Sequence, residues 1–154
     1  MALVIVVFAQ YLLWYFAGRG TADDAATTWA VDNMLKNWRS LNVTPDHFFL
    51  CIDSVDSSSP ESIERIAGKL EQMEIETHFG SDFLVLRRES AEADTTITSL
   101  CTQPKVNTPL FAVVEVRDGY GKMPGFGYSQ DEVFLFVFGT WLHIGGLERR
   151  RLIY

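Results

Sequence analysis

The chain has 154 residues and a formal net charge of −7, and hydrophobic residues make up 47% of it. This length favours one domain with a core of its own. The acidic balance argues against nucleic-acid binding, because phosphate contacts need clustered lysines and arginines. It is compatible with a solvated surface or with a basic protein partner.

An uncharged apolar run opens the chain, and Gln10 is the only strongly polar side chain in residues 2–18. The run is close to the roughly 17–25 apolar residues of a transmembrane helix. Aromatic residues lie towards its end, as is typical of helices that reach a membrane interface. We therefore expect a single-pass membrane anchor at residues 1–18, a connector at 19–24 and one α+β domain at 25–154.

Two alternatives remain open for this run. A cleaved signal peptide normally begins with a basic segment, and none precedes the apolar residues here. A buried strand followed by a buried helix would also absorb it, because "ALVIVVF" is rich in β-branched residues. If the run is an anchor, Arg19, Lys36 and Arg39 behind it favour a cytoplasmic domain. If it is a core element, the protein is a soluble cytoplasmic one.

Two helices are expected in the first half of the chain. Thr21 is a possible N-cap for a helix that ends near Leu41. Ser59 followed by Pro60 predicts the start of a second helix. Its apolar residues recur at helical spacing and should form the buried face: Ile63, Ile66, Ala67, Leu70 and Met73.

Strands are expected at residues 48–55, 110–117 and 132–144, with a hairpin around Gly80-Ser81 and a short last strand near the end. Residues 89–101 are ambiguous between helix and strand. The element order over residues 48–117 resembles the ferredoxin-like split βαβ arrangement, an antiparallel sheet with two or three helices. This resemblance is one of element order and implies nothing about function.

The segment from Asp53 to Pro60 is the best candidate for a ligand site. We expect it to be a loop between a buried strand and a helix N-terminus, where open α/β sheets place ligands. The candidate ligand-binding residues are Asp53, Asp56, Ser57, Ser58 and Ser59. Carboxylates favour a divalent cation such as Mg²⁺, and the helix end favours phosphate. Turn and capping chemistry explains the same residues without any ligand.

A glycine-rich loop at residues 118–130 is the candidate for partner binding. Its spacing misses both common nucleotide-binding patterns. Its candidate partner-binding residues are Tyr120, Lys122, Phe126 and Tyr128, since aromatic side chains dominate interface energetics. The alternative is a long hairpin loop with no binding role.

The remaining reactive side chains form no recognisable catalytic set. Cys51 and Cys101 are interpreted as small buried hydrophobic residues, with a disulfide between them as the alternative. His47, His78 and His143 have no metal-binding spacing, so no metal site is predicted. The nucleophile-elbow pattern G-x-S-x-G does not occur in the sequence.

These observations favour a membrane-anchored, non-enzymatic subunit or interaction module with a protein partner and no nucleic acid. One alternative is a small soluble enzyme that binds a metal or phosphate ligand at the Asp53–Pro60 segment. The other is a soluble, acidic inhibitor or binding protein for a basic partner.

Overall fold

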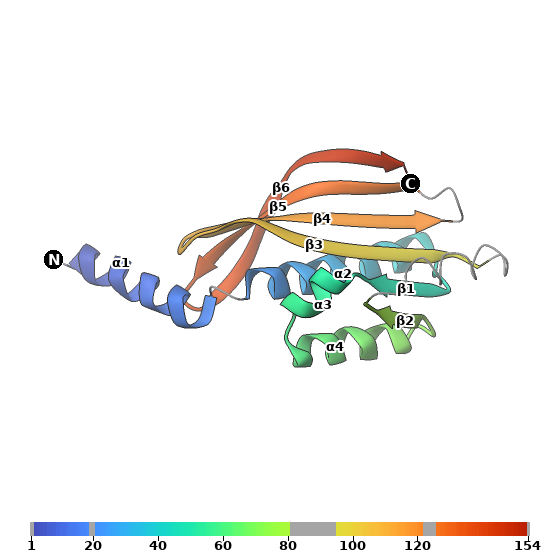
Figure 1. Cartoon of the computed structure of the whole chain (residues 1–154), viewed down its shortest axis with the longest axis horizontal. Coiled ribbons are helices and arrows are strands. Elements are labelled where there is room, and N and C mark those ends of the chain that lie inside the picture. Colours follow the sequence, from blue (N-terminus) through green and yellow to red (C-terminus); the bar gives the residue numbers. More distant parts are fainter. Residues whose placement is uncertain (1, 19–20, 81–94, 122–125, 154) are drawn as a thin grey trace.

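The computed structural model describes residues 2–18, 21–80, 95–121 and 126–153. It is an α+β fold in which helices α2, α3 and α4 cover one face of a six-stranded mixed sheet, while α1 extends away from it (Figure 1). The helices are α1 (Ala2–Leu13), the π-helix η1 (Trp14–Gly18), α2 (Ala22–Leu41), α3 (Ile52–Ser57) and α4 (Pro60–Glu71). The strands are β1 (His47–Leu50), β2 (Glu76–Phe79), β3 (Ile97–Asn107), β4 (Phe111–Gly121), β5 (Phe126–Val137) and β6 (Thr140–Ile153).

The strand order is β2-β1-β3-β4-β5-β6. The short strand β1 runs parallel to both of its neighbours, and β3 to β6 form an antiparallel meander of long strands. Helix α4 lies in the connection between β1 and β2, as parallel pairing requires. The α+β class is confirmed. The ferredoxin-like arrangement is not confirmed, because the described sheet is mixed and not antiparallel.

Both expected helices are present. Helix α2 ends at Leu41, although that side chain is 70% exposed, and Thr21 makes no capping hydrogen bond. Helix α4 begins as predicted, because the Ser59 hydroxyl accepts a hydrogen bond from the Ser62 backbone N–H and Pro60 occupies the first turn. The main core lies between these helices and the sheet, and its buried residues include Val31, Leu35, Trp38, Phe48, Leu50, Ile66, Leu70 and Leu100.

Several expected elements differ from the structure. The strand expected at 48–55 ends at Leu50, and α3 follows at once. The strand expected at 132–144 is divided by a tight turn, in which Phe138 and Gly139 adopt φ angles of 46° and 89°. Residues 97–101 belong to a strand. Only β2 is described from the hairpin expected around Gly80-Ser81, because its second half lies outside the described residues.

Three buried hydroxyl groups connect α2, α3 and β3. Strand β1 pairs with β3 only as far as Leu100, so the next backbone N–H on that edge, from Thr102, has no strand partner there. The Ser54 hydroxyl accepts this hydrogen bond at 2.7 Å. The Thr102 hydroxyl lies 2.9 Å from Ser54 Oγ and 2.8 Å from Thr27 Oγ1. All three side chains are buried. Beyond the end of β1, helix α3 thus takes the place of a neighbouring strand, and the Thr102 N–H and the three hydroxyls still have hydrogen-bond partners.

We predict that Ser54→Ala lowers the free energy of unfolding by about 1–3 kcal/mol, because it leaves the buried Thr102 N–H without an acceptor. Urea denaturation followed by circular dichroism measures the effect. The control is Ser40→Ala, which removes an exposed hydroxyl on α2. A surface change of this kind should alter stability by at most about 0.5 kcal/mol. Equal stability of the two variants would contradict the role assigned to Ser54.

A second prediction concerns Asp23, in the first turn of α2. Burial raises the pKa of its carboxyl to about 6, against the opposing effect of a hydrogen bond from Ser57. One carboxyl oxygen is buried without a hydrogen-bond partner among the described residues. The folded state therefore binds a proton that the unfolded state releases. Stability consequently falls as the pH rises from about 3.8 to about 6.

Asp23→Asn should remove this loss and raise stability at pH 7 by about 1 kcal/mol, a value reduced for partial solvent exposure. Urea unfolding between pH 4 and pH 7 measures it. Glu64→Gln makes the same change of charge at an exposed position on α4 and serves as the control. A parallel pH dependence in Asp23→Asn and the original chain would refute the prediction.

Candidate functional site

Helix α1 is apolar and exposed on every side. Its residues Val4 to Phe8 are between 55% and 70% exposed. Successive helical residues are rotated by about 100°, so five consecutive exposed residues cover the whole circumference. The apolar run is therefore a protruding helix and not a buried strand. Within the described part of the chain, no helix has both the length and the apolar content that crossing a membrane requires.

The base of α1 is fixed to the sheet by the polar atoms of the run. The Gln10 amide donates hydrogen bonds to two backbone carbonyls, Phe136 O at 2.6 Å and Pro109 O at 3.3 Å. The Trp14 indole N–H donates to Asn107 Oδ1 at 3.1 Å. These acceptors come from the β3–β4 and β5–β6 hairpins. Gln10 thus joins the helix to both hairpins with the one strongly polar side chain of the run.

Gly18 completes this attachment. A Cβ atom at this position would lie 2.7 Å from the Phe136 ring and 3.1 Å from the Trp14 ring. The Gly18 carbonyl also accepts a hydrogen bond from the Trp141 indole at 3.2 Å. The close approach of η1 to the sheet therefore requires a residue without a side chain.

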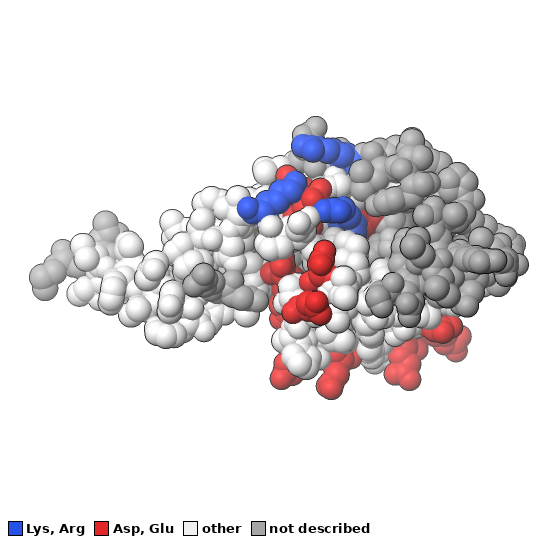
Figure 2. Space-filling view, in the orientation of Figure 1, with Lys and Arg blue, Asp and Glu red and all other residues white. Residues whose placement is uncertain are grey.

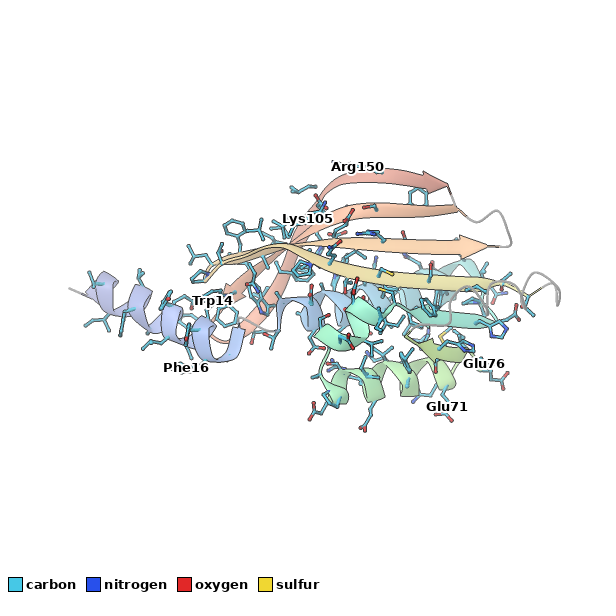
Figure 3. All side chains as sticks on the ribbon, viewed as in Figure 1. Trp14, Phe16, Glu71, Glu76, Lys105 and Arg150 are labelled. Carbon is cyan, nitrogen blue, oxygen red and sulfur yellow. The ribbon has the colours of Figure 1, made fainter. Side chains whose placement is uncertain are left out.

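The apolar surface continues from α1 onto the sheet. The tips of both hairpins expose large apolar side chains, with Leu110 at 60% and Phe138 at 79%. We define the apolar end as the exposed apolar residues of α1 and η1, together with Val106, Leu110, Phe111, Leu135, Phe138, Leu142 and Ile144. Among the residues that Figure 2 colours, this end displays no charged side chain, and Figure 3 places Phe16 within it.

A charged network marks the limit of the apolar end on the open face of the sheet. Residues at alternate positions of a strand share a face, so Phe111, Val113, Glu115 and Arg117 follow one another along one face of β4. Lys105 Nζ lies 2.6 Å from a carboxylate oxygen of Asp131 and 3.8 Å from one of Glu115.

The surroundings of Glu115 keep it charged. Its carboxylate accepts a hydrogen bond from Ser129 and lies 3.2 Å from the Arg117 guanidinium. The Ser129 hydrogen bond, with Arg117 and Lys105, holds the pKa of Glu115 below its usual value. The face therefore changes from apolar to ionised between Val113 and Glu115.

The residues proposed from the sequence as a ligand site lie on α3 and between α3 and α4. The segment is partly helical: Asp53, Asp56 and Ser57 belong to α3, and both carboxylates are exposed. Neither carboxylate belongs to a group of three potential metal ligands among the described residues. Ser59 caps α4 and contacts Asp24, and Ser58 precedes it at the end of α3.

The proposed partner-binding loop is shorter than expected. Lys122 lies outside the described residues. Tyr120 and Phe126 are paired backbone positions at the ends of β4 and β5. Of the four side chains, only that of Tyr128 is described, and it is 38% exposed.

Cys51 and Cys101 are half-buried free thiols whose side chains are hydrogen-bonded to each other. That hydrogen bond lowers the pKa of Cys51 to about 6, and it raises the pKa of Cys101 together with burial. The thiols are therefore free and only half-buried, where the sequence predicted small buried hydrophobic residues with a disulfide as the alternative.

An open groove of about 600 Å³ lies beside α2 and the Phe138–Trp141 turn. Asp24, Asp32 and Arg65 of its lining have partners within the protein, and Lys36 of its lining is exposed. Lys69 Nζ lies 2.5 Å from the Asp32 carboxylate of the groove wall, and the Arg65 guanidinium donates to the Thr28 and Ser62 hydroxyls. Most of the charged side chains that line the groove are therefore paired within the protein.

Sequence reasoning missed two groupings. The first is the pair of hairpin tips, which were not recognised as part of the apolar surface. Gly139 was the available sequence signal for the turn between β5 and β6. His47 and His78 were treated as distant, although parallel pairing of β1 and β2 brings them together with Glu76.

Comparisons with known proteins gave no match. No protein-family model, no curated protein and no solved structure matches the chain.

We predict that Gly18→Ala lowers the free energy of unfolding by about 1–3 kcal/mol, because the new methyl group meets the buried Phe136 ring. Gly68→Ala in the interior of α4 is the control, since a Cβ atom there has no neighbour within 4 Å. This change should stabilise the protein by up to about 1 kcal/mol. Thermal unfolding of both variants provides the measurement, and a neutral or stabilising Gly18→Ala would contradict the packing described.

Proposed function

We propose that the protein attaches to a membrane through its apolar end and acts as a non-enzymatic interaction module whose α+β domain faces water. The observation that carries the proposal is the exposure of α1 on all sides, continuous with the apolar hairpin tips. Membrane attachment was also the leading expectation from the sequence.

Lipid suits this helix better than a protein groove. A groove covers one face of a helix and leaves the other in water, whereas acyl chains surround it completely. The backbone of a helix is hydrogen-bonded internally and can enter an apolar medium. Ten large apolar residues of α1 and η1 are exposed. At about 1.5–3 kcal/mol for each fully buried side chain, their transfer is favourable by on the order of 10 kcal/mol even when burial is incomplete.

The arrangement of polar groups supports an orientation in which α1 enters the membrane and the α+β domain faces water. Helix α1 is shorter than the thickness of a hydrocarbon core, so it would enter one leaflet from the side of the domain. Gln10 satisfies its amide hydrogens inside the protein, so it does not oppose insertion. Trp14 and Tyr15 follow α1, where aromatic rings suit the lipid headgroup region. The charged network around Glu115 lies beyond the apolar end and suits the aqueous side.

A basic protein partner fits the domain. Exposed acidic side chains recur along α4 and just after it: Glu61, Glu64, Glu71 and Glu74. Figure 2 shows red side chains along the edge of the molecule where α4 lies. Complementary charge on a partner would accelerate association and fix its orientation.

Flotation with phosphatidylcholine vesicles tests membrane attachment by the full chain. We expect the protein to float with neutral vesicles and to remain bound in high salt, because apolar transfer is not screened. The double variant Val6→Glu, Phe8→Glu should lower the bound-to-free ratio at least tenfold, since each charge costs about 2.5–3.5 kcal/mol in a bilayer centre.

The matched control is Leu41→Glu. Leu41 is as exposed as Val4, but it lies at the far end of α2. This variant should float as the original chain does. A full chain that stays at the bottom with neutral and with anionic vesicles would refute the proposal, as would undiminished binding of the double variant. Self-association through α1 in place of vesicle binding would also refute it.

A further inference from the structure

We propose that His47, Glu76 and His78 form a binding site for a divalent transition metal, with Zn²⁺ as the first candidate. This inference is independent of membrane attachment. It concerns the end of the sheet opposite to α1, and Figure 3 shows Glu76 at the far side of the molecule from Trp14 and Phe16.

The site follows from the register of two parallel strands. His47 is the first residue of β1 and Glu76 the first residue of β2, and the two are paired directly. His78 follows two residues later, opposite Phe49. Because side chains alternate between the faces of a sheet, Glu76 and His78 share a face. His47 lies on that same face, since its ring contacts both side chains.

The donor atoms already have the spacing of a metal site. His47 Nδ1 lies 3.3 Å from His78 Nε2. The two Glu76 oxygens lie 3.5 Å from His47 Nδ1 and 3.6 Å from His78 Nε2 respectively. Two ligands at about 2.0–2.1 Å from a tetrahedral zinc ion are themselves about 3.3 Å apart. A single ion placed among the three side chains therefore needs only small side-chain movements.

The backbone holds the three residues in place. The His47 N–H donates to Thr96 O at 3.1 Å, and the Glu76 N–H donates to Asp46 O at 3.1 Å. The Asp46 carboxylate accepts hydrogen bonds from Thr96 N at 2.7 Å and Thr96 Oγ1 at 2.9 Å. Asp46 is thereby engaged in joining β1 to the chain before β3, and it supports the site without serving as a ligand.

The chemistry of the donors selects the class of metal. Imidazole suits zinc, copper, nickel and iron, whereas Mg²⁺ and Ca²⁺ prefer oxygen ligands. Two histidines and one glutamate leave a fourth position of a tetrahedral ion for water or a small anion. The His47 and His78 side chains are 19% and 29% exposed, and Glu76 is 66% exposed, so an ion can enter from solvent.

Without a metal, the two facing ring nitrogens share one hydrogen: one donates and the other accepts. A bound ion replaces this hydrogen bond by two coordinate bonds. The donor ring then carries its hydrogen on its other nitrogen, so both imidazoles bind the ion in their neutral form.

Isothermal titration of the full chain in nonionic detergent with Zn²⁺ tests the proposal. We expect one equivalent to bind with a micromolar or lower Kd. Co²⁺ in the same position should give the visible absorption of a tetrahedral ion. Glu76→Gln, at an exposed position where the fold is not at risk, should weaken binding at least tenfold, and so should His47→Ala and His78→Ala.

Two controls keep the result specific. His143→Gln changes the third histidine, which contacts Glu132 and Trp29, and should leave zinc affinity unchanged. Cys51→Ser removes a thiol that binds zinc readily and should also leave affinity unchanged. The proposal is overturned if the full chain binds no zinc at about 100 µM, a hundredfold above a micromolar Kd. It is also overturned if Glu76→Gln, His47→Ala and His78→Ala all retain the original affinity, or if Cys51→Ser abolishes binding.

Discussion

The short length of β1 is the constraint on which the rest of the structure depends. Strand β3 has 11 residues and β1 only 4, so β1 covers less than half of the β3 edge that faces it. An unpaired buried N–H costs as much as a lost hydrogen bond, and Ser54 on α3 supplies the missing acceptor. This contact places α3 against the sheet and directs the chain into α4. The crossover then sets β2 parallel to β1, which is the pairing that unites His47 with Glu76.

The opposite end of the sheet is organised by a different set of polar contacts. Gln10 contacts one carbonyl from each of two hairpins, so a single amide holds α1 at a defined position relative to the sheet. Gly18 permits the close approach, and the Trp14 and Trp141 indoles provide two further hydrogen bonds. A protruding apolar helix would otherwise be free to fold back and bury its surface against the open face of the sheet. The attachment thus preserves the exposure on which the proposed function rests.

Local patterns were sufficient to predict some elements. Ser59, Pro60 and the apolar spacing of α4 specify one helix start and one buried face, and the structure has both. The turn at Phe138 was missed because phenylalanine rarely adopts a positive φ angle, so only Gly139 indicated it. Asp and Ser serve capping and binding equally well, and in the Asp53–Ser59 segment the structure shows the capping role at Ser59. The histidine pair depends on the register between two strands that are far apart in the sequence, which no short pattern encodes.

The sharp change along β4, from Phe111 and Val113 to Glu115 and Arg117, has a consequence for how the whole molecule is oriented. Because β3, β4 and β5 are hydrogen-bonded in fixed register, the ionised residues on the three strands form a band that cannot tilt relative to the apolar tips. If the apolar end enters a membrane as far as this band, the parallel strands β1 and β2 lie in the solvent at the opposite end of the sheet. The imidazoles of His47 and His78 would then face the bulk solution, away from the lipid headgroups and accessible to dissolved ions.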